Sequence, residues 1–199
     1  MIIKISSGKL RGRKIAAPSG IRTRPTSGRL KKSLFDVLAP VLPGARVLDL
    51  FAGAGALGLE ALSRGAGWAV FVDRARSAAR AIRENLERLG LSGQGEVLQR
   101  DALTALHALS KRGERFDVVF VDPPYRAAGY GAVLERIDAS GLLSSRGVVV
   151  VEHHHKASVA ERYGELVQAR RLRAGESCLS FFRRGSDAAS AGTAFDGRI

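Results

Sequence analysis

The chain has 199 residues, 45% of them hydrophobic and 26% charged, a composition typical of one globular domain with a sizeable core. It contains no run of 18 consecutive apolar residues and no apolar segment behind its basic N-terminus, so we expect neither a transmembrane helix nor a secretory signal. The single cysteine, Cys178, cannot form an internal disulfide, which fits a cytoplasmic protein, and the net charge of +13 predicts an acidic partner.

Basic residues gather at the N-terminal end of the chain. Residues 1–35 contain ten lysines and arginines and no acid, whereas residues 36–199 hold 22 bases against 19 acids. Charge segregated in this way is typical of an arm that binds a polyanion, and the alternative is a solvated surface that only aids solubility. We therefore expect residues 1–40 to form a basic extension that binds nucleic acid, with a hairpin over residues 1–16 and a helix over residues 27–39.

The rest of the chain alternates between apolar runs and helical periods. Near-continuous apolar segments predict five buried strands and two closing strands, at residues 46–50, 68–72, 96–98, 116–121, 147–151, 166–173 and 177–182. The segments between them predict helices, at residues 75–89, 102–110, 129–138 and 157–162. This pattern predicts an α/β fold over residues 41–184, with a doubly wound, seven-stranded and mostly parallel sheet covered on both faces. The small and polar residues of 185–199 predict a disordered tail.

A glycine-rich segment, residues 49–58, follows the first of these strands and opens a helix. Its glycines at positions 53, 55 and 58 fit the spacing G-x-G-x-x-G, which allows the backbone to approach a ligand at a helix N-terminus. Asp73 lies 20 residues after Gly53 at the end of the second strand, where its carboxylate can accept two hydrogen bonds from a ribose diol. The alternative is a tight strand-to-helix turn that binds no ligand.

The identity of the ligand depends on Asp49, which lies just ahead of the glycines. A carboxylate there repels a pyrophosphate and attracts an ammonium group. The pattern therefore favours S-adenosylmethionine, which carries an ammonium, a sulfonium and no phosphate, over NAD. A third acid, Asp101, follows the third strand, where it can accept a hydrogen bond from an adenine amine or cap the next helix.

The fourth strand runs directly into the corner Asp122-Pro123-Pro124-Tyr125. Two prolines stiffen this corner, so that the Asp122 side chain and the Pro123 carbonyl become two fixed acceptors beside the aromatic face of Tyr125. That set fits a planar exocyclic amine, whose two N–H groups are held while its ring stacks on the tyrosine. Such orientation favours attack of the amine on a methyl donor, and the alternative is an ordinary proline turn.

Together these motifs resemble those of class I S-adenosylmethionine-dependent methyltransferases that methylate amino nitrogens. The arm is more specific, because Gly8-Lys9-Leu10-Arg11-Gly12-Arg13-Lys14, followed by Arg24-Pro25-Thr26 and Leu34-Phe35, is similar to the bacterial 16S rRNA guanine-N2 methyltransferase family. The resemblance covers residues 1–184. It implies in-line methylation of the N2 amine of one guanine in 16S rRNA, on the small ribosomal subunit or an assembly intermediate. The target guanine would leave its stack to reach the pocket.

The resemblance also implies roles for individual residues. Those that would bind the methyl donor are Asp49, Phe51, Gly53, Gly55, Asp73 and Asp101. Those that would form the catalytic corner and position the guanine are Asp122, Pro123 and Tyr125. Those that would contact RNA phosphates are Arg11, Arg13, Lys14, Arg24 and Arg29. Within the first set, Asp49 would lie near the amino-acid end of the donor, Asp73 at its ribose and Asp101 at its adenine end.

Three further residues or runs are assigned no chemistry. The run His153–His155 has no second histidine pair or Cys-x-x-Cys beside it, so we expect a solvated loop or an RNA contact and no metal site. Glu152 ends the fifth strand, where it either borders the pocket or has a structural role. Cys178 lies in an apolar stretch and is expected to be a core residue rather than a nucleophile.

Three other functions stay open on the sequence alone. A DNA adenine-N6 methyltransferase acts on the same kind of amine, so the corner does not separate it from an RNA enzyme. A nicotinamide-dependent oxidoreductase would use the same glycine loop, but residues 120–199 offer no separate substrate domain. A non-catalytic RNA-binding protein would have no use for the intact corner at Asp122–Tyr125.

Overall fold

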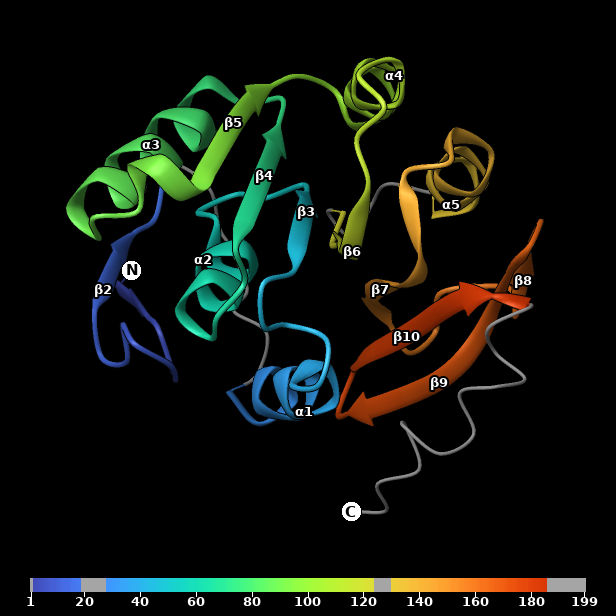
Figure 1. The fold of residues 1–199 in the computed structure, drawn as a ribbon. Coiled ribbons are helices and arrows are strands. Elements are labelled where there is room, and N and C mark those ends of the chain that lie inside the picture. Colours follow the sequence, from blue (N-terminus) through green and yellow to red (C-terminus); the bar gives the residue numbers. More distant parts are fainter. Residues whose placement is uncertain (1, 19–27, 124–129, 186–199) are drawn as a thin grey trace.

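The computed structural model of this protein describes residues 2–18, 28–123 and 130–185 (Figure 1). The strands within these ranges are β1 Ile2–Lys4, β2 Lys14–Ala16, β3 Arg46–Leu50, β4 Trp68–Asp73, β5 Gly95–Gln99, β6 Phe116–Val121, β7 Leu143–His154, β8 Arg162–Tyr163, β9 Leu166–Ala174 and β10 Ser177–Arg184. The helices are α1 Gly28–Leu38, α2 Ala56–Ser63, α3 Arg76–Arg88, α4 Ala102–Lys111 and α5 Tyr130–Ser140, with a 3₁₀ turn at Ser92–Gln94. No described helix combines the length and the apolarity needed to cross a bilayer.

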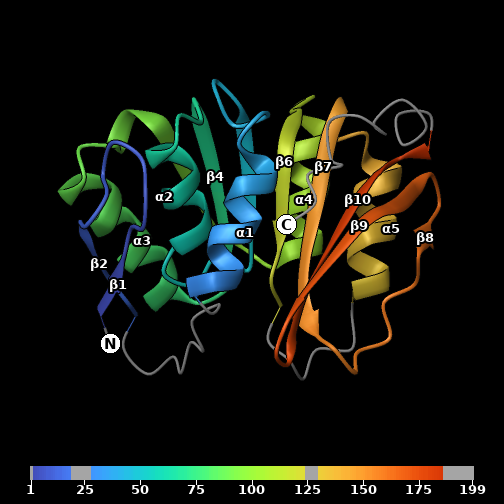
Figure 2. The ribbon, with the colours of Figure 1, turned by 90° about the horizontal axis from the view of Figure 1, so that it is seen from below.

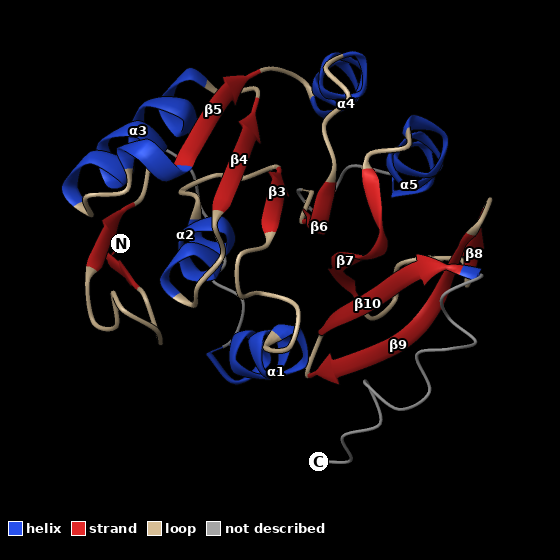
Figure 3. Cartoon of the chain, viewed as in Figure 1, coloured by secondary structure: helices blue, strands red, loops and turns tan. Residues whose placement is uncertain are grey.

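One large sheet organises the fold, with the strand order β5-β4-β3-β6-β7-β10-β9-β8. The strands from β5 to β7 run parallel, whereas β10 lies antiparallel between β7 and β9 (Figure 3). Because β3 has β4 on one side and β6 on the other, the chain direction across the sheet reverses there, and the crevice at the carboxyl ends of β3 and β6 is the place where such folds bind ligands. The predicted doubly wound and mostly parallel α/β fold is confirmed.

Neighbouring residues of the central strands supply two separate cores. In β3, Val47 packs with residues of α1, α2 and α3, whereas Leu48 packs with residues of α4 and α5. Val118 and Val119 of β6 divide in the same way, because successive side chains of a strand point to opposite faces. Figures 1 and 2 show the two groups of helices on opposite faces of the sheet. Strands buried on both faces explain the uninterrupted apolar runs of the sequence.

The N-terminal part of the chain has the predicted elements. β1 and β2 form an antiparallel hairpin in which Ile3 lies opposite Ile15. In α1, the four apolar residues at helical spacing are all buried, namely Leu30, Leu34, Phe35 and Leu38. These side chains join the same core as α2 and α3, so α1 packs directly on the sheet domain.

Two expectations for the C-terminal part are wrong, namely the helix at 157–162 and the total of seven strands, because the described sheet has eight. The helix predicted at 157–162 is replaced by irregular chain that leads into β8, an eighth strand of two residues. It pairs with β9 across a two-residue turn at Gly164, whose φ of 60° suits glycine and closes a hairpin where a helix would need to continue. The tail at 186–199 lies outside the described residues.

The histidine run is also not a solvated loop. β7 continues to His154 because β10 pairs with it from Val149 to His154, with Ser177 opposite His154. His153 is fully buried, and its Nε2 hydrogen-bonds the Ser180 hydroxyl at 2.9 Å. Burial lowers the pKa of His153, so this side chain is a neutral core residue at neutral pH. Cys178 on β10 is buried as predicted.

Candidate active site

Acidic residues line the carboxyl edge of the parallel strands. Asp101 follows β5, Asp73 ends β4, Asp49 lies near the end of β3 and Asp122 follows β6. Because these four strands are neighbours in the order β5-β4-β3-β6, the predicted site residues fall in one row along the edge of the sheet. The topology thus brings together acids that lie up to 73 positions apart in the sequence.

The glycine turn after β3 has a backbone that few other residues adopt. Gly53 has a φ of 56° and Gly55 a φ of 77°, and Phe51 adopts the left-handed region as well, with a φ of 64°. A Cβ added at Gly53 would meet nothing within 4 Å, so this backbone faces open space. A Cβ at Gly58 would instead clash with the Phe71 ring. Gly53 therefore suits a close ligand, and Gly58 allows α2 to pack on β4.

Asp73 holds this turn in place. Its Oδ2 accepts a hydrogen bond from the backbone N–H of Gly53 at 2.9 Å, and its Oδ1 accepts one from Ala75 at 2.8 Å. Each carboxylate oxygen has a second lone pair, so Asp73, which is half-buried, can still accept bonds from a diol. The sequence spacing predicted this acid at the glycine turn, and the direct bond to Gly53 gives the physical reason for it.

Asp49 lies deeper than Asp73. It is buried, and its Oδ2 accepts a hydrogen bond from the backbone N–H of Gly58 at 2.9 Å. Burial raises the pKa of Asp49 to about 7, against the lowering effect of the Gly58 bond, and the nearby Asp73 raises it further. A cation bound beside it would favour the charged carboxylate.

Asp101 stands at the β5 end of the row, and Phe51 follows β3 inside it. Asp101 is exposed and caps α4, because its Oδ1 accepts a hydrogen bond from the Leu103 N–H at 3.0 Å. Because Asp101 is exposed, its carboxylate stays accessible to a ligand at the end of β5. Phe51 is partly buried and packs against the core that faces α4 and α5.

The corner after β6 is described as far as Pro123. Asp122 is partly buried and Pro123 is buried, whereas Tyr125 lies outside the described residues. The pKa of Asp122 lies well above its ordinary value, because burial disfavours the charge and because Glu152 and Asp49 lie close enough to repel it. A carboxylate in this position gains from any cation or N–H donor that enters the site.

Glu152 is the neighbour on the next strand. Val121 of β6 lies opposite Val151 of β7, so Asp122 and Glu152 each follow one residue later at the same edge. Glu152 is buried. The sequence left its role open, although a single acid directly after the apolar run 147–151 was a signal that it faces something polar.

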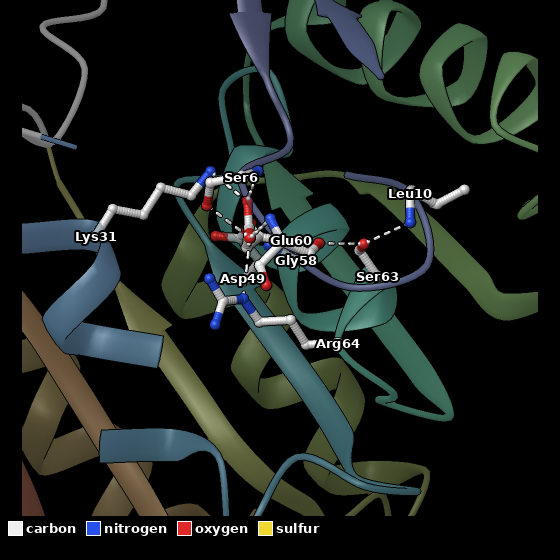
Figure 4. A network of polar contacts seen from close by, with 9 residues as sticks. Ser6, Leu10, Lys31, Asp49, Gly58, Glu60, Ser63 and Arg64 are labelled. Atoms are coloured by element: carbon white, nitrogen blue, oxygen red, sulfur yellow. Dashed lines mark hydrogen bonds and ion pairs between the residues drawn. The ribbon is translucent and has the colours of Figure 1, made fainter. Parts of the chain in front are cut away.

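Glu60 of α2 is a buried acid whose role the sequence did not predict. It binds the basic hairpin to α2 (Figure 4). Glu60 is fully buried and accepts hydrogen bonds from the backbone of Ser6 and Ser7 and from the Ser6 hydroxyl, at 2.8–3.0 Å. It also forms ion pairs with Lys31 of α1 at 2.7 Å and with Arg64 at 2.9 Å. One acid in an otherwise apolar helix, ALGLEALS, was the available signal.

The basic residues of the arm surround this anchored hairpin. Arg11, Arg13 and Lys14 are exposed on it, and Arg29 is exposed in the first turn of α1. Arg24 lies outside the described residues. The described arm thus presents cations outward, as expected for phosphate contacts. Among the described residues no cluster of three metal-ligating side chains occurs.

The arrangement as a whole is suited to a ligand that carries hydroxyls and a positive charge. The open backbone at Gly53 admits it, Asp73 offers acceptors, and Asp49 and Asp122 are carboxyl groups that a cation would ionise. Asp122 and the Pro123 carbonyl stand beside that place as acceptors for an amine.

The comparisons with known proteins agree with this geometry. Residues 3–183 match the model of the family described as conserved hypothetical protein 95. A Bacillus subtilis (strain 168) protein, provisionally named as the rRNA methyltransferase YlbH, is 38% identical over 182 residues, which cover 92% of this chain and 99% of that protein. Ribosomal RNA small subunit methyltransferase D of Escherichia coli (strain K12) is 37% identical over 150 residues, which cover 75% of this chain and 74% of that protein. A solved Escherichia coli structure, provisionally assigned as the methyltransferase yhhF, has a TM-score of 0.80 at 33% identity and covers 92% of this chain and 98% of its own.

Proposed function

The chain belongs to the family described as conserved hypothetical protein 95, and we propose that it methylates ribosomal RNA with S-adenosylmethionine as the methyl donor. The proposed target is the exocyclic N2 amine of one guanine in 16S rRNA, on the small ribosomal subunit or an assembly intermediate. Two relatives support the substrate class, since both are named rRNA methyltransferases and one is named for the small subunit. The observation that carries the proposal is the position of Asp122 beside the glycine turn that Asp73 holds.

The residues of the turn fit the donor. The open backbone at Gly53 lets the ligand approach closely, and the remaining lone pairs of Asp73 accept bonds from the ribose hydroxyls. Asp49 favours the ammonium group because a cation restores the charge that burial disfavours. Phe51 and Gly55 complete the turn, and Asp101 lies at the adenine end. The bound donor supplies a methyl group made electrophilic by the sulfonium.

The corner after β6 orients the nucleophile. A guanine amine is weak because its lone pair delocalises into the ring. Asp122 and the Pro123 carbonyl would each accept one N–H, which turns the nitrogen lone pair toward the methyl group, while Tyr125 would stack on the base. As the new N–C bond forms, the bond between the methyl carbon and the sulfur would break, and the electron pair would stay on the sulfur of a neutral thioether. The nitrogen then carries an extra proton, which passes to a carboxylate oxygen of Asp122 or to water. The raised pKa of Asp122 makes it a better acceptor for that proton.

RNA would be held by the basic arm. Arg11, Arg13, Lys14 and Arg29 are exposed cations in the described part of it, and we assign them and Arg24 to phosphate contacts. Their contribution is electrostatic and independent of sequence. The choice of one guanine therefore falls to the shape of the folded RNA and to the pocket that takes the flipped base.

A methyl-transfer assay tests the proposal. Small ribosomal subunits from cells that lack the protein are incubated with the purified enzyme and labelled S-adenosylmethionine, beside duplex DNA and beside the Asp122→Ala variant. We expect label only in 16S rRNA, only with the wild type, and in N2-methylguanosine after digestion to nucleosides. Label in N6-methyladenosine of the DNA, or none in either nucleic acid, would reject the proposed substrate.

A further inference from the structure

A groove runs between the end of the basic hairpin and α3. It is lined by Ala16 and Pro18 on one side and by Arg76, Ser77 and Arg80 on the other, and its volume is about 470 Å³. That size is within the roughly 300–1,000 Å³ of pockets that hold small ligands. Figure 1 shows β2 and α3 side by side along this boundary.

The groove lies in a strongly basic surface. The hairpin contributes five exposed bases and α3 four, namely Lys4, Lys9, Arg11, Arg13, Lys14, Arg76, Arg80, Arg83 and Arg88. Against them stand only two acids of α3, Glu84 and Glu87. By sequence order alone, α3 belongs to the part of the chain with almost balanced charge. The fold places its arginines beside the arm and so extends the cationic surface beyond the first 40 residues.

Helix stability does not explain the positions of Arg76 and Arg80. Arg76 occupies the first position of α3, and the first turn of this helix contains no acid. A cation at a helix N-terminus is unfavourable, because the macrodipole is positive there. Arg80 pairs with Glu84 at 3.0 Å, but both side chains are largely exposed, with 80% and 50% of their surfaces accessible, so this pair contributes little. An anion bound in the groove would offset this unfavourable interaction between Arg76 and the macrodipole.

The two walls are fixed to each other and to the candidate site. The buried Asn85 of α3 bonds both backbone groups of Ala16 and also the carbonyl of Ala54 in the glycine turn. At the hairpin, a guanidinium nitrogen of Arg13 donates to the carbonyl of Arg88 at 2.8 Å. The Arg76 end of the groove begins three residues after Asp73. A chain lying in the groove would thus lead from the hairpin to the carboxyl edge of the sheet.

We propose that this groove binds the sugar-phosphate backbone of the substrate RNA, with Arg76 and Arg80 as its phosphate contacts. The inference rests on the proposed function, since it names a second RNA contact surface for the same reaction. Guanidinium groups suit phosphate oxygens, and the small side chains of Ala16 and Pro18 leave room for a ribose. Glu84 limits the affinity by drawing Arg80 away from the phosphate.

The test compares variants of equal charge. Arg76→Ala/Arg80→Ala removes two cations from the groove, and Arg136→Ala/Arg146→Ala removes two exposed cations from α5 and from the start of β7. We expect the groove variant to raise the KM for small subunits roughly 10-fold and to lower the slope of log affinity against log salt for 16S rRNA by about 1.5. The control variant should change neither the KM nor the salt slope. Glu84→Gln should tighten binding.

Two further readouts separate the possible failures. The affinity for S-adenosylmethionine, measured by calorimetry, should be the same in the groove variant and the wild type, which shows that the nearby Asp73 turn is intact. If the wild type methylates no rRNA, the proposed function fails. If the wild type is active and the groove variant matches it in KM and salt slope, the groove assignment alone is overturned. A variant that binds naked 16S rRNA normally but not the particle would assign the groove to a ribosomal protein and reject RNA.

Discussion

Asn85 of α3 pairs its side-chain amide with both backbone polar groups of Ala16 at the end of β2. Its Oδ1 accepts a hydrogen bond from the Ala16 N–H at 2.8 Å, and its Nδ2 donates to the Ala16 carbonyl at 3.0 Å. The same Nδ2 donates to the carbonyl of Ala54 at 3.2 Å. One buried amide therefore holds the basic hairpin against the turn that we assign to the methyl donor.

We predict that Asn85→Ala weakens both the fold and donor binding. The substitution leaves the backbone groups of Ala16 and Ala54 without this partner, and each unsatisfied buried group costs about 1–3 kcal/mol. The free energy of unfolding, from denaturant titration, should fall by roughly 2–4 kcal/mol, and the Kd for S-adenosylmethionine should rise. The control is Gln94→Ala, which removes another carboxamide that contacts the hairpin, through Lys9 at 3.4 Å. If the two variants lost the same free energy of unfolding and the same donor affinity, the role of Asn85 would be contradicted.

Glu60→Gln should destabilise the protein through the hairpin and α1. The change leaves Lys31 and Arg64 without their ion-pair partner, although these side chains keep 12% and 15% of their surfaces exposed. We therefore expect a loss of about 2–3 kcal/mol, below the value for a fully buried pair. Burial alone would raise the pKa of Glu60, but hydrogen bonds from Lys31 and Ser6 outweigh it and lower the pKa below 4.5.

The lowered pKa of Glu60 fixes the sign of the pH effect. Its contribution to stability is present above pH 4.5 and is lost as the pH falls through the lower folded pKa. Denaturant titrations at several pH values should show this acid loss in the wild type and a smaller one in Glu60→Gln. Glu135→Gln, an exposed acid of α5, is the control. Identical acid profiles for Glu60→Gln and the wild type would refute this assignment.

Asp49 should give the opposite pH dependence. Its folded pKa of about 7 lies above the ordinary 3.8, so the folded state binds more protons between these values. The stability of the ligand-free protein should then decrease as the pH rises from about 4 to 7, by at most about 1.4 kcal/mol per unit. Asp49→Asn should remove the decrease. Because the donor ammonium favours the carboxylate, its affinity should increase over the same interval, and a flat calorimetric profile would count against Asp49 at the ammonium.

Asp122→Ala should nearly abolish methyl transfer while the donor still binds. Because the pKa of Asp122 is raised by burial and by Glu152, single-turnover rates should increase with pH as Asp122 ionises. Glu152→Gln removes one like charge, so the midpoint of this increase should move to lower pH. Lost donor binding in Asp122→Ala, with normal single-turnover chemistry in particles at saturating donor, would show that the assignment of Asp122 is wrong.

The sequence predicted the parts of the fold that depend on local pattern. Apolar periodicity located β3 to β6 and α1, and the reversal of strand order brought Asp73 and Asp122 to one edge as expected for a doubly wound sheet. Glycine spacing also identified the turn, where Gly53 faces open space and Gly58 packs on Phe71. The elements and the turn follow from short-range chemistry, and the shared edge follows from the general rule for doubly wound sheets.

The sequence pattern could not predict the contacts that join distant segments. Glu60 binds Ser6, 54 positions away, and Asn85 binds Ala16, 69 positions away. In the sequence, each is only a polar residue on an otherwise apolar helix face, and nothing near it identifies the partner. His153 is buried because β10 pairs with the end of β7. Three consecutive histidines do not indicate that a strand pairs there. The arginines of α3 join the RNA surface that we propose only through the position of β2.

The most direct test of the central claim is nucleoside mass spectrometry of 16S rRNA from cells with and without this protein. We expect N2-methylguanosine to decrease by one residue per small subunit when the protein is absent. Wild-type protein should restore that residue, and Asp122→Ala should not. An unchanged content of N2-methylguanosine, with another modified nucleoside missing instead, would contradict the proposed function.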